Sequence, residues 1–219
     1  DLHSFPTRRS SDLWSLLEIG AVFLRPEEPF TWASGIKSPI YCDNRLILSA
    51  PEVRNVVELA IADTISNEYP DCEIIMGTST AGIAHAAIAG HILEKPVGYV
   101  RSGTKDHGRT NKIEGKLNKG DKVVIVEDLI STAGSAIQTA EALREAGGRV
   151  LGIVSIFTYG MKRASDNLTA ARLKNISLSD LDSLISVAAK EKYIREDQIQ
   201  EIIDFRDNPE DVSWMKGEK

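Results

Sequence analysis

Cysteine and aromatic residues are scarce in this chain of 219 residues. It has two cysteines, Cys42 and Cys72, and aromatic residues make up 6% of the sequence. The cysteines form no CxxC pair and have no clustered histidines beside them, so neither a zinc site nor a disulfide framework is expected. We expect two reduced thiols near the core of a cytoplasmic protein.

Long apolar segments and a positive net charge are also missing. No apolar run approaches the ~18 residues that a membrane helix needs. The nearest stretch, Leu13–Leu24, is broken by Glu18 and Gly20, and no signal-cleavage pattern follows it. The net charge of −6 disfavours broad binding to nucleic acid or to anionic membranes, although it allows a local basic site. We therefore expect neither nucleic acid nor membrane as a partner.

The length is typical of one domain. Residues 1–13 are rich in serine and arginine and show no clear period, so we expect a disordered or non-native tail, with a native arm as the alternative. Residues 14–219 are then expected to form a single domain.

Apolar strands alternate with helices through most of that domain. The pattern predicts strands at Glu73–Met76, Pro96–Val100, Lys122–Val126 and Val150–Phe157, and helices from Pro51, at Ile83–Leu93 and at Ala133–Ala146. This alternation predicts an α/β fold with a central, mainly parallel sheet flanked by helices. Right-handed crossovers would bring the loops after the strands, at 77–82, 101–119 and 127–135, to one edge of the sheet.

One of these loops carries the most informative motif. The apolar strand is followed by Glu127 and Asp128 and then by a loop with serine, threonine and glycine that opens a helix. Unpaired N–H groups at such a helix start, together with the helix dipole, suit a phosphate. The two acids would repel a phosphate, so they fit ribose hydroxyls or a metal-bound diol. The motif therefore indicates a phosphorylated ribose, with an ordinary capped helix beside two surface acids as the alternative.

The run Glu127–Ser135 resembles the phosphoribosyl-diphosphate signature of type I phosphoribosyltransferases. Two further segments, Phe30–Pro39 with Tyr41–Asp43 and Tyr99–Gly108, resemble the N-terminal hood and the flexible catalytic loop of orotate phosphoribosyltransferases. The resemblance extends from about Leu13 to the C-terminus and is closest to the form found in bacilli. It implies a type I phosphoribosyltransferase fold with a small hood from about residue 14 to residue 45 and added C-terminal helices.

The resemblance also implies an activity and its residues. The reaction is transfer of the 5-phosphoribosyl group from phosphoribosyl diphosphate to orotate in pyrimidine biosynthesis, by a homodimer with shared active sites. Mg²⁺ is held mainly through the substrate and has no direct protein ligand. The implied catalytic residues are Lys105, His107 and Asp128, and Lys105 matches the lysine that reaches the neighbouring subunit's site. The donor-binding residues are Arg101, Lys105, His107, Glu127, Asp128, Leu129, Ile130, Ser131, Thr132, Ala133, Gly134 and Ser135, and Ser131 also binds orotate.

The charge of the catalytic loop agrees with an anionic ligand. Residues 101–112 hold four cations against Asp106 alone, a local charge of +3 in an acidic chain. The remaining histidines, His3, His85 and His91, have no spacing suited to a metal and are expected to be structural or exposed.

Four positions depart from the pattern of some relatives. Ala33, Ala81, Ser102 and Tyr159 stand where those enzymes carry basic residues. Orotate recognition is then expected to depend on the hood backbone and on Ser131.

Three other readings remain open. A purine phosphoribosyltransferase would share the donor loop, but the hood segment argues against it. A non-catalytic regulator that binds nucleic acid is disfavoured by the acidic composition. A purely structural α/β domain would leave the three matching segments unexplained.

Overall fold

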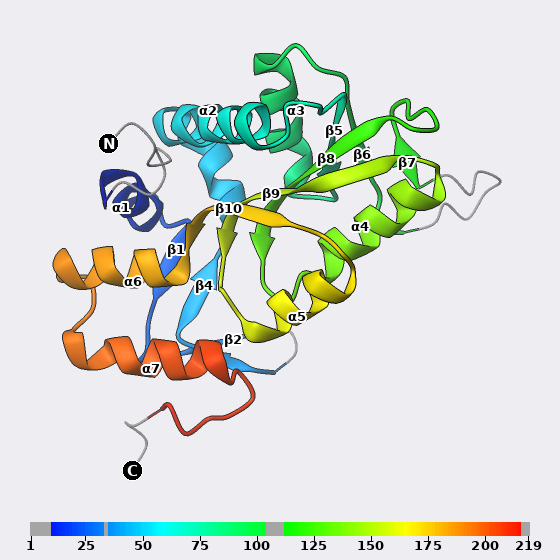
Figure 1. Cartoon of the computed structure of the whole chain (residues 1–219). Coiled ribbons are helices and arrows are strands. Elements are labelled where there is room, and N and C mark those ends of the chain that lie inside the picture. The colour runs from blue at the N-terminus through cyan, green and yellow to red at the C-terminus, as the bar shows by residue number, and fades with distance from the viewer. Residues whose placement is uncertain (1–9, 33–34, 104–111, 216–219) are drawn as a thin grey trace.

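A six-stranded sheet forms the centre of the computed structural model, which describes residues 10–32, 35–103 and 112–215 (Figure 1). The strand order is β10-β9-β8-β5-β6-β7, and every neighbouring pair is parallel except β6 and β7. The predicted α/β fold with a mainly parallel sheet is therefore confirmed. The strands are β5 (Ile74–Thr78), β6 (Val97–Val100), β7 (Ile113–Glu114), β8 (Lys122–Ile130), β9 (Arg149–Thr158) and β10 (Asn175–Asp180).

Helices cover both faces of this sheet because its central strands are apolar on both sides. In β8, Val124 and Val126 belong to the core that includes α2 and α3, whereas Val123 and Ile125 belong to the core that includes α4. Side chains of a strand alternate between its faces, which explains this division. The helices are α2 (Pro51–Glu68), α3 (Gly82–Ile92), α4 (Gly134–Glu145) and α5 (Lys162–Ala170).

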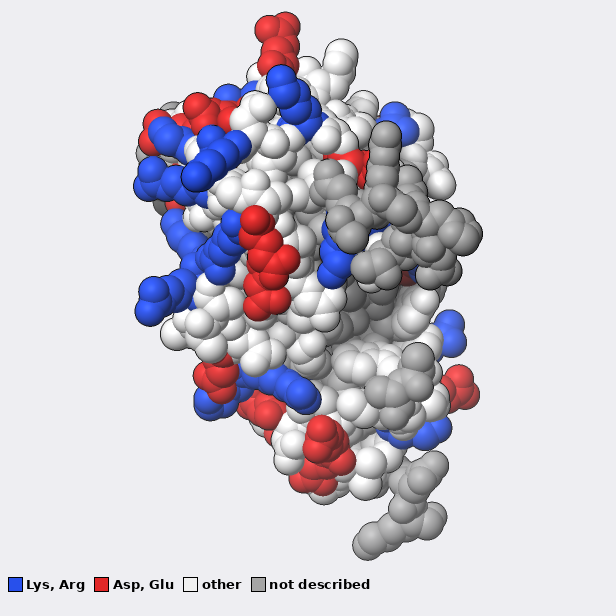
Figure 2. Space-filling model, turned by 90° about the vertical axis from the view of Figure 1, so that its right-hand side faces the viewer, with Lys and Arg blue, Asp and Glu red and all other residues white. Residues whose placement is uncertain are grey.

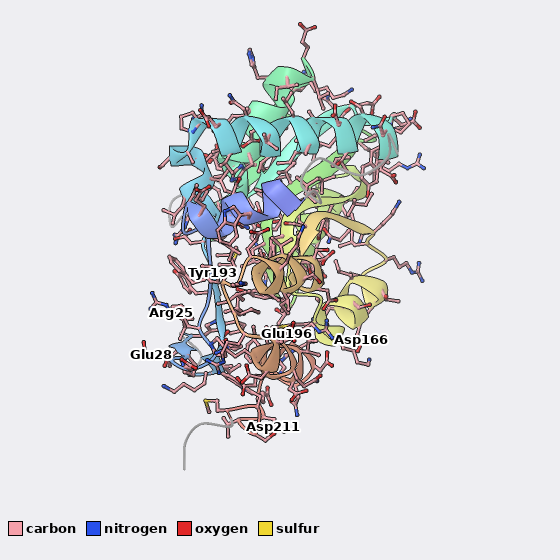
Figure 3. The ribbon with its side chains drawn as sticks, turned by 90° about the vertical axis from the view of Figure 1, so that its left-hand side faces the viewer. Arg25, Glu28, Asp166, Tyr193, Glu196 and Asp211 are labelled. Atoms are coloured by element: carbon pink, nitrogen blue, oxygen red, sulfur yellow. The ribbon has the colours of Figure 1, made fainter. Side chains whose placement is uncertain are left out.

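The hood and the C-terminal helices lie side by side (Figures 1 and 3). Rings of Trp14 and Tyr193 meet edge to face at 6.1 Å, and Arg195 pairs with Glu27. The hood consists of α1 (Ser10–Glu18), β1 (Val22–Leu24) paired with β4 (Ile40–Cys42), β2 (Phe30–Thr31) paired with β3 (Lys37–Ser38), and the 3-10 helix η2 (Asn44–Ser49). The C-terminal helices are α6 (Leu181–Lys190) and α7 (Glu196–Asp207).

Two boundaries differ from the sequence-based expectation. Strand β8 continues past Val126 to Ile130, because Glu127, Leu129 and Ile130 pair with β9. The weak strand preference of two acids is overridden by this pairing with a long neighbour. The segment expected to be one long loop, 101–119, contains β7, which pairs antiparallel to β6. The acid pair therefore lies within a strand and not in a loop.

The division of the chain after residue 13 stays a prediction. Helix α1 begins at Ser10, within the expected tail of residues 1–13, and residues 1–9 lie outside the described residues. Both cysteines are free, with Cys72 buried and Cys42 partly buried, as expected. Within the described ranges, no helix has both the length and the apolarity required to cross a bilayer.

Candidate active site

Glu127 joins three elements at the carboxyl edge of the sheet. Its side chain is only 4% exposed. The Oε1 atom accepts hydrogen bonds from Thr78 Oγ1 at 2.6 Å and from the Asp128 N–H at 3.1 Å. The Oε2 atom accepts one from Ser135 Oγ at 2.8 Å. Glu127 thus connects the ends of β5 and β8 to the start of α4, and its expected contact with ribose stays a prediction.

Burial changes the acidity of this carboxyl group. Desolvation raises the pKa of Glu127 from 4.5 to about 7, and the neighbouring Asp128 carboxyl adds to the rise. The hydrogen bonds from Thr78 and Ser135 oppose it. Near neutral pH, Glu127 is therefore only partly ionised.

A residue that sequence reasoning missed joins the hood to the acid pair, Glu127 and Asp128. Asn44, the first residue of η2, is fully buried, and its Nδ2 donates to the Asp128 carbonyl oxygen at 2.7 Å. No local pattern marks this asparagine, because its partner lies 84 positions away. The bond places the half-buried Asp128 directly beside the hood.

The predicted phosphate loop has an open helix start. Ala133 is the N-cap of α4, has a φ of 66°, and gives the helix no side-chain cap. This left-handed conformation costs an alanine roughly 1 kcal/mol, so the surrounding contacts must hold it. One such contact is the bond from Asn167 Nδ2 to the Thr132 carbonyl oxygen at 2.9 Å. The first N–H groups of α4 therefore have no side-chain cap, and their expected binding of a phosphate stays a prediction.

The loop after β5 packs closely against the same edge. Ser79 donates to the Val100 carbonyl oxygen through its N–H at 3.2 Å and through its Oγ at 2.5 Å. A Cβ on Gly82 would lie 2.5 Å from the Val126 carbonyl oxygen, so only glycine fits there. The ends of β5 and β6 and the strand β8 are thus brought together at one edge, as expected, whereas residues 104–111 of the loop after β6 lie outside the described residues.

The basic residues of the catalytic loop are only partly described. Arg101 follows β6, and its Nη1 lies 3.7 Å from Glu114 Oε1. Lys105 and His107 lie outside the described residues. Figure 2 shows the right-hand face of the molecule, where described acidic and basic side chains lie close together.

An aromatic cavity of about 220 Å³ lies between the hood and the segment that contains Leu129 and Ser131. The rings of Trp32 and Tyr159 are stacked, with centroids 5.8 Å apart and an interplanar angle of 23°. Burial raises the pKa of Tyr159 well above its usual value, so its phenol stays neutral. The lining residues are Trp32, Tyr41, Cys42, Leu129, Ser131 and Tyr159.

The resemblance implied that Ser131 binds orotate, and the structure puts Ser131 in the lining of this cavity, whose aromatic walls were not foreseen. Tyr159 follows β9 and Trp32 belongs to the hood, so nothing in either local sequence shows that the rings meet. A larger cavity of about 620 Å³ lies between α1 and α2, and none of the predicted site residues lines it. We therefore assign the site by its chemistry and not by cavity size.

The other titratable groups of the described residues form no cluster suited to a metal. Within the described parts of the chain, no group of three or more His, Cys, Asp or Glu side chains could hold a metal ion. His85 is fully buried with its Nδ1 2.5 Å from Glu58 Oε1, and His91 is exposed, so the expectations for both are confirmed.

Comparison with known proteins identifies the family. A family model described as "Phosphoribosyl transferase domain" matches residues 46–193. An orotate phosphoribosyltransferase of Bacillus cereus (strain G9842) is 54% identical over 200 residues, which are 91% of this chain and 95% of the relative. The corresponding protein of Bacillus cytotoxicus shows the same identity and coverage.

Solved structures agree in fold. Orotate phosphoribosyltransferase from Aeropyrum pernix gives a TM-score of 0.72 at 28% identity, over 84% of this chain and 99% of that one. Leishmania donovani UMP synthase gives 0.76 at 25% identity, over 91% of this chain but only 42% of that longer one. The expected type I phosphoribosyltransferase fold is therefore confirmed. Because the two Bacillus relatives are 54% identical over 91% of the chain and the family model matches residues 46–193, we conclude that the chain belongs to the orotate phosphoribosyltransferase family.

Proposed function

We propose that this chain transfers the 5-phosphoribosyl group from phosphoribosyl diphosphate to orotate, giving orotidine 5′-phosphate and diphosphate in pyrimidine biosynthesis. One observation carries the proposal. An aromatic cavity that suits a planar base opens beside Glu127 and Asp128 of β8 and beside the start of α4, which has no side-chain cap. A donor and an acceptor could therefore bind next to each other. The curated relatives carry the corresponding name.

The donor would be held by residues 127–135. The open N–H groups of α4 and the hydroxyls of Ser131, Thr132 and Ser135 suit the 5′-phosphate. Asp128 is the better placed acid for the ribose hydroxyls, because both carboxyl oxygens of Glu127 already accept bonds from the protein. Glu127 then positions the strand and the helix start around the sugar.

Orotate would occupy the aromatic cavity. A flat ring can pack against the aromatic rings of Trp32, Tyr41 and Tyr159. The Ser131 hydroxyl supplies a polar contact at the edge of the same cavity. This arrangement requires no basic residue at position 159, where some relatives carry an arginine.

The reaction needs no nucleophilic side chain. The orotate ring nitrogen forms a bond to the anomeric carbon as the bond from that carbon to the diphosphate oxygen breaks, with inversion, and the proton lost from the nitrogen can pass to the departing diphosphate. Positive charge develops on the sugar ring, and the Asp128 carboxylate can stabilise it. Arg101, Lys105 and His107 would neutralise the leaving diphosphate. The chain thus acts by positioning and by electrostatics.

The described residues fit a Mg²⁺ that is bound chiefly through the substrate. They offer carboxylate oxygens at Asp128 but no cluster of three ligands. Mg²⁺ commonly keeps water and substrate phosphates among its ligands. When bound, it would offset the negative charge of the donor.

We further propose a homodimer in which Lys105 of one subunit serves the other subunit's site. This follows from the family resemblance of the catalytic loop. Size-exclusion chromatography with light scattering gives the mass in solution, and a monomer that turns over normally would contradict the proposal.

An absorbance assay for orotate consumption tests the proposed function. Purified protein is mixed with orotate and Mg²⁺, with and without phosphoribosyl diphosphate, and diphosphate release is measured in parallel. We expect consumption only with the donor, and no diphosphate release with adenine, hypoxanthine or xanthine. Release with a purine base, or no orotate consumption, would refute the proposal. A gel shift with RNA or DNA in the absence of turnover would favour the regulator instead.

A further inference from the structure

A series of aromatic rings connects the C-terminal segment to the aromatic cavity. Trp214, which follows α7, meets Phe205 of that helix edge to face at 5.8 Å and 70°. Phe205 meets Trp32 of the hood at 5.6 Å and 86°. Trp32 in turn stacks on Tyr159 in the cavity wall. Figures 1 and 3 show α7 lying beside the hood, so the ring contacts join the C-terminal helices to the hood.

Trp32 has open space on two sides. It lines the aromatic cavity and also a second cavity of about 220 Å³, which we call the rear cavity and which is bordered by Ile36, Thr132, Met161 and the end of α7. Because it lies between two cavities, the Trp32 side chain is not closely packed on every side. The stacked ring of Tyr159 and the nearly perpendicular ring of Phe205 are therefore the ring contacts that fix the Trp32 indole.

Trp214 supports this arrangement from behind. It is 2% exposed and lies in a turn closed by the bond from the Met215 N–H to the Val212 carbonyl oxygen. Its Nε1 is buried and has no acceptor among the described residues. Packing, and not a hydrogen bond, therefore holds the Trp214 ring against the fully buried Phe205.

We propose that Trp214 is a positioning residue for the acceptor site: it holds Phe205, and through Phe205 it fixes Trp32 at the wall of the aromatic cavity. Trp214 lines neither cavity, so it acts only through the other rings. The inference rests on the proposed function, because it takes the aromatic cavity as the place where orotate binds.

The proposal predicts an effect on one substrate only. Ser131 and Thr132 line the same cavities as Trp32, but the donor residues are held by bonds in which Trp32 takes no part, from Thr78 and Ser135 to Glu127 and from Asn167 to Thr132. Loosening Trp32 should therefore weaken orotate binding and leave donor binding unchanged. A general loss of stability would affect both substrates together.

Steady-state kinetics with each substrate varied in turn provides the test. We expect Trp214→Leu to raise the KM for orotate by roughly three- to tenfold, the affinity equivalent of one aromatic pair, with the KM for the donor unchanged. Trp214→Phe keeps an aromatic ring and should restore most of the loss. Val212 lies in the same turn but is 58% exposed, so Val212→Ala is the control and should behave as the wild type.

A double-mutant cycle separates positioning from a merely structural role. In a Trp32→Leu background, Trp214→Leu should cause no further rise in the KM for orotate, because the residue through which it acts is gone. If Trp214→Leu does not fold, the same cycle with Trp214→Phe takes its place, with a smaller expected shift.

Three outcomes would overturn the inference: an unchanged KM for orotate, an equal rise for both substrates, or an undiminished effect without Trp32. If the wild type uses orotate and any one of these outcomes is found, this inference is refuted but the proposed function is not. A wild type that cannot use orotate would instead refute the proposed function, and this inference with it.

Discussion

The buried Glu127 carboxyl should make the stability of the protein depend on pH. Its folded-state pKa of about 7 lies above its ordinary value of 4.5, so the folded protein holds this proton more tightly than the unfolded chain does. The stabilisation is therefore fully present below pH 4.5 and is lost as the pH rises through 7. The rise from 4.5 to about 7 corresponds to about 3 kcal/mol over the whole titration, most of it between pH 5 and pH 8.

Glu127→Gln isolates this contribution, because the amide resembles the protonated acid but cannot ionise. We expect the stability of the variant relative to wild type to rise by about 3 kcal/mol from acid to alkaline pH. For a chain of this length, that is a relative shift of about 6–12 °C in Tm.

Urea unfolding from pH 5 to pH 9, at one fixed protein concentration, measures the effect. Glu141→Gln is the matched control, because it makes the same change at an exposed position of α4. Its stability curve should run parallel to that of the wild type. If the Glu127→Gln curve is parallel as well, the carboxyl is ionised normally in the folded state and the reasoning from burial fails.

Three further predictions concern activity or stability. Asp128→Asn should lower kcat/KM for the donor by at least about tenfold while circular dichroism stays unchanged; an unaltered value would remove this acid from the mechanism. Lys105→Ala should lower turnover by roughly 10²-fold, and near-normal turnover would contradict its role. If Lys105 acts in the neighbouring site, mixing the Lys105→Ala and Asp128→Asn proteins so that subunits exchange should restore about a quarter of wild-type activity, because about half of the dimers are then mixed and each mixed dimer has one intact site. Stable mixed dimers without activity would contradict this placement of Lys105. Gly82→Ala places a methyl group against Thr78 and the Val126 carbonyl oxygen, so it should cost roughly 1–3 kcal/mol in urea unfolding and reduce activity; wild-type stability would show that the loop can move aside.

The sequence by itself determined the kind of fold, and it predicts the kind of donor site. Alternating apolar strands and helices predict a parallel sheet because side-chain periodicity is a local property. The run from Glu127 to Ser135 predicts a sugar-phosphate site because its acids, hydroxyls and helix start are contiguous. These features need no knowledge of which distant residues meet.

Only the tertiary structure decided how the site is built. It extends β8 through the acid pair, turns Glu127 toward Thr78 and Ser135, and places Asn44 beneath Asp128. It also brings Trp32 onto Tyr159 to form the aromatic cavity. Each of these contacts but one joins residues far apart in the chain, so their formation depends on the packing of whole elements and not on any local pattern.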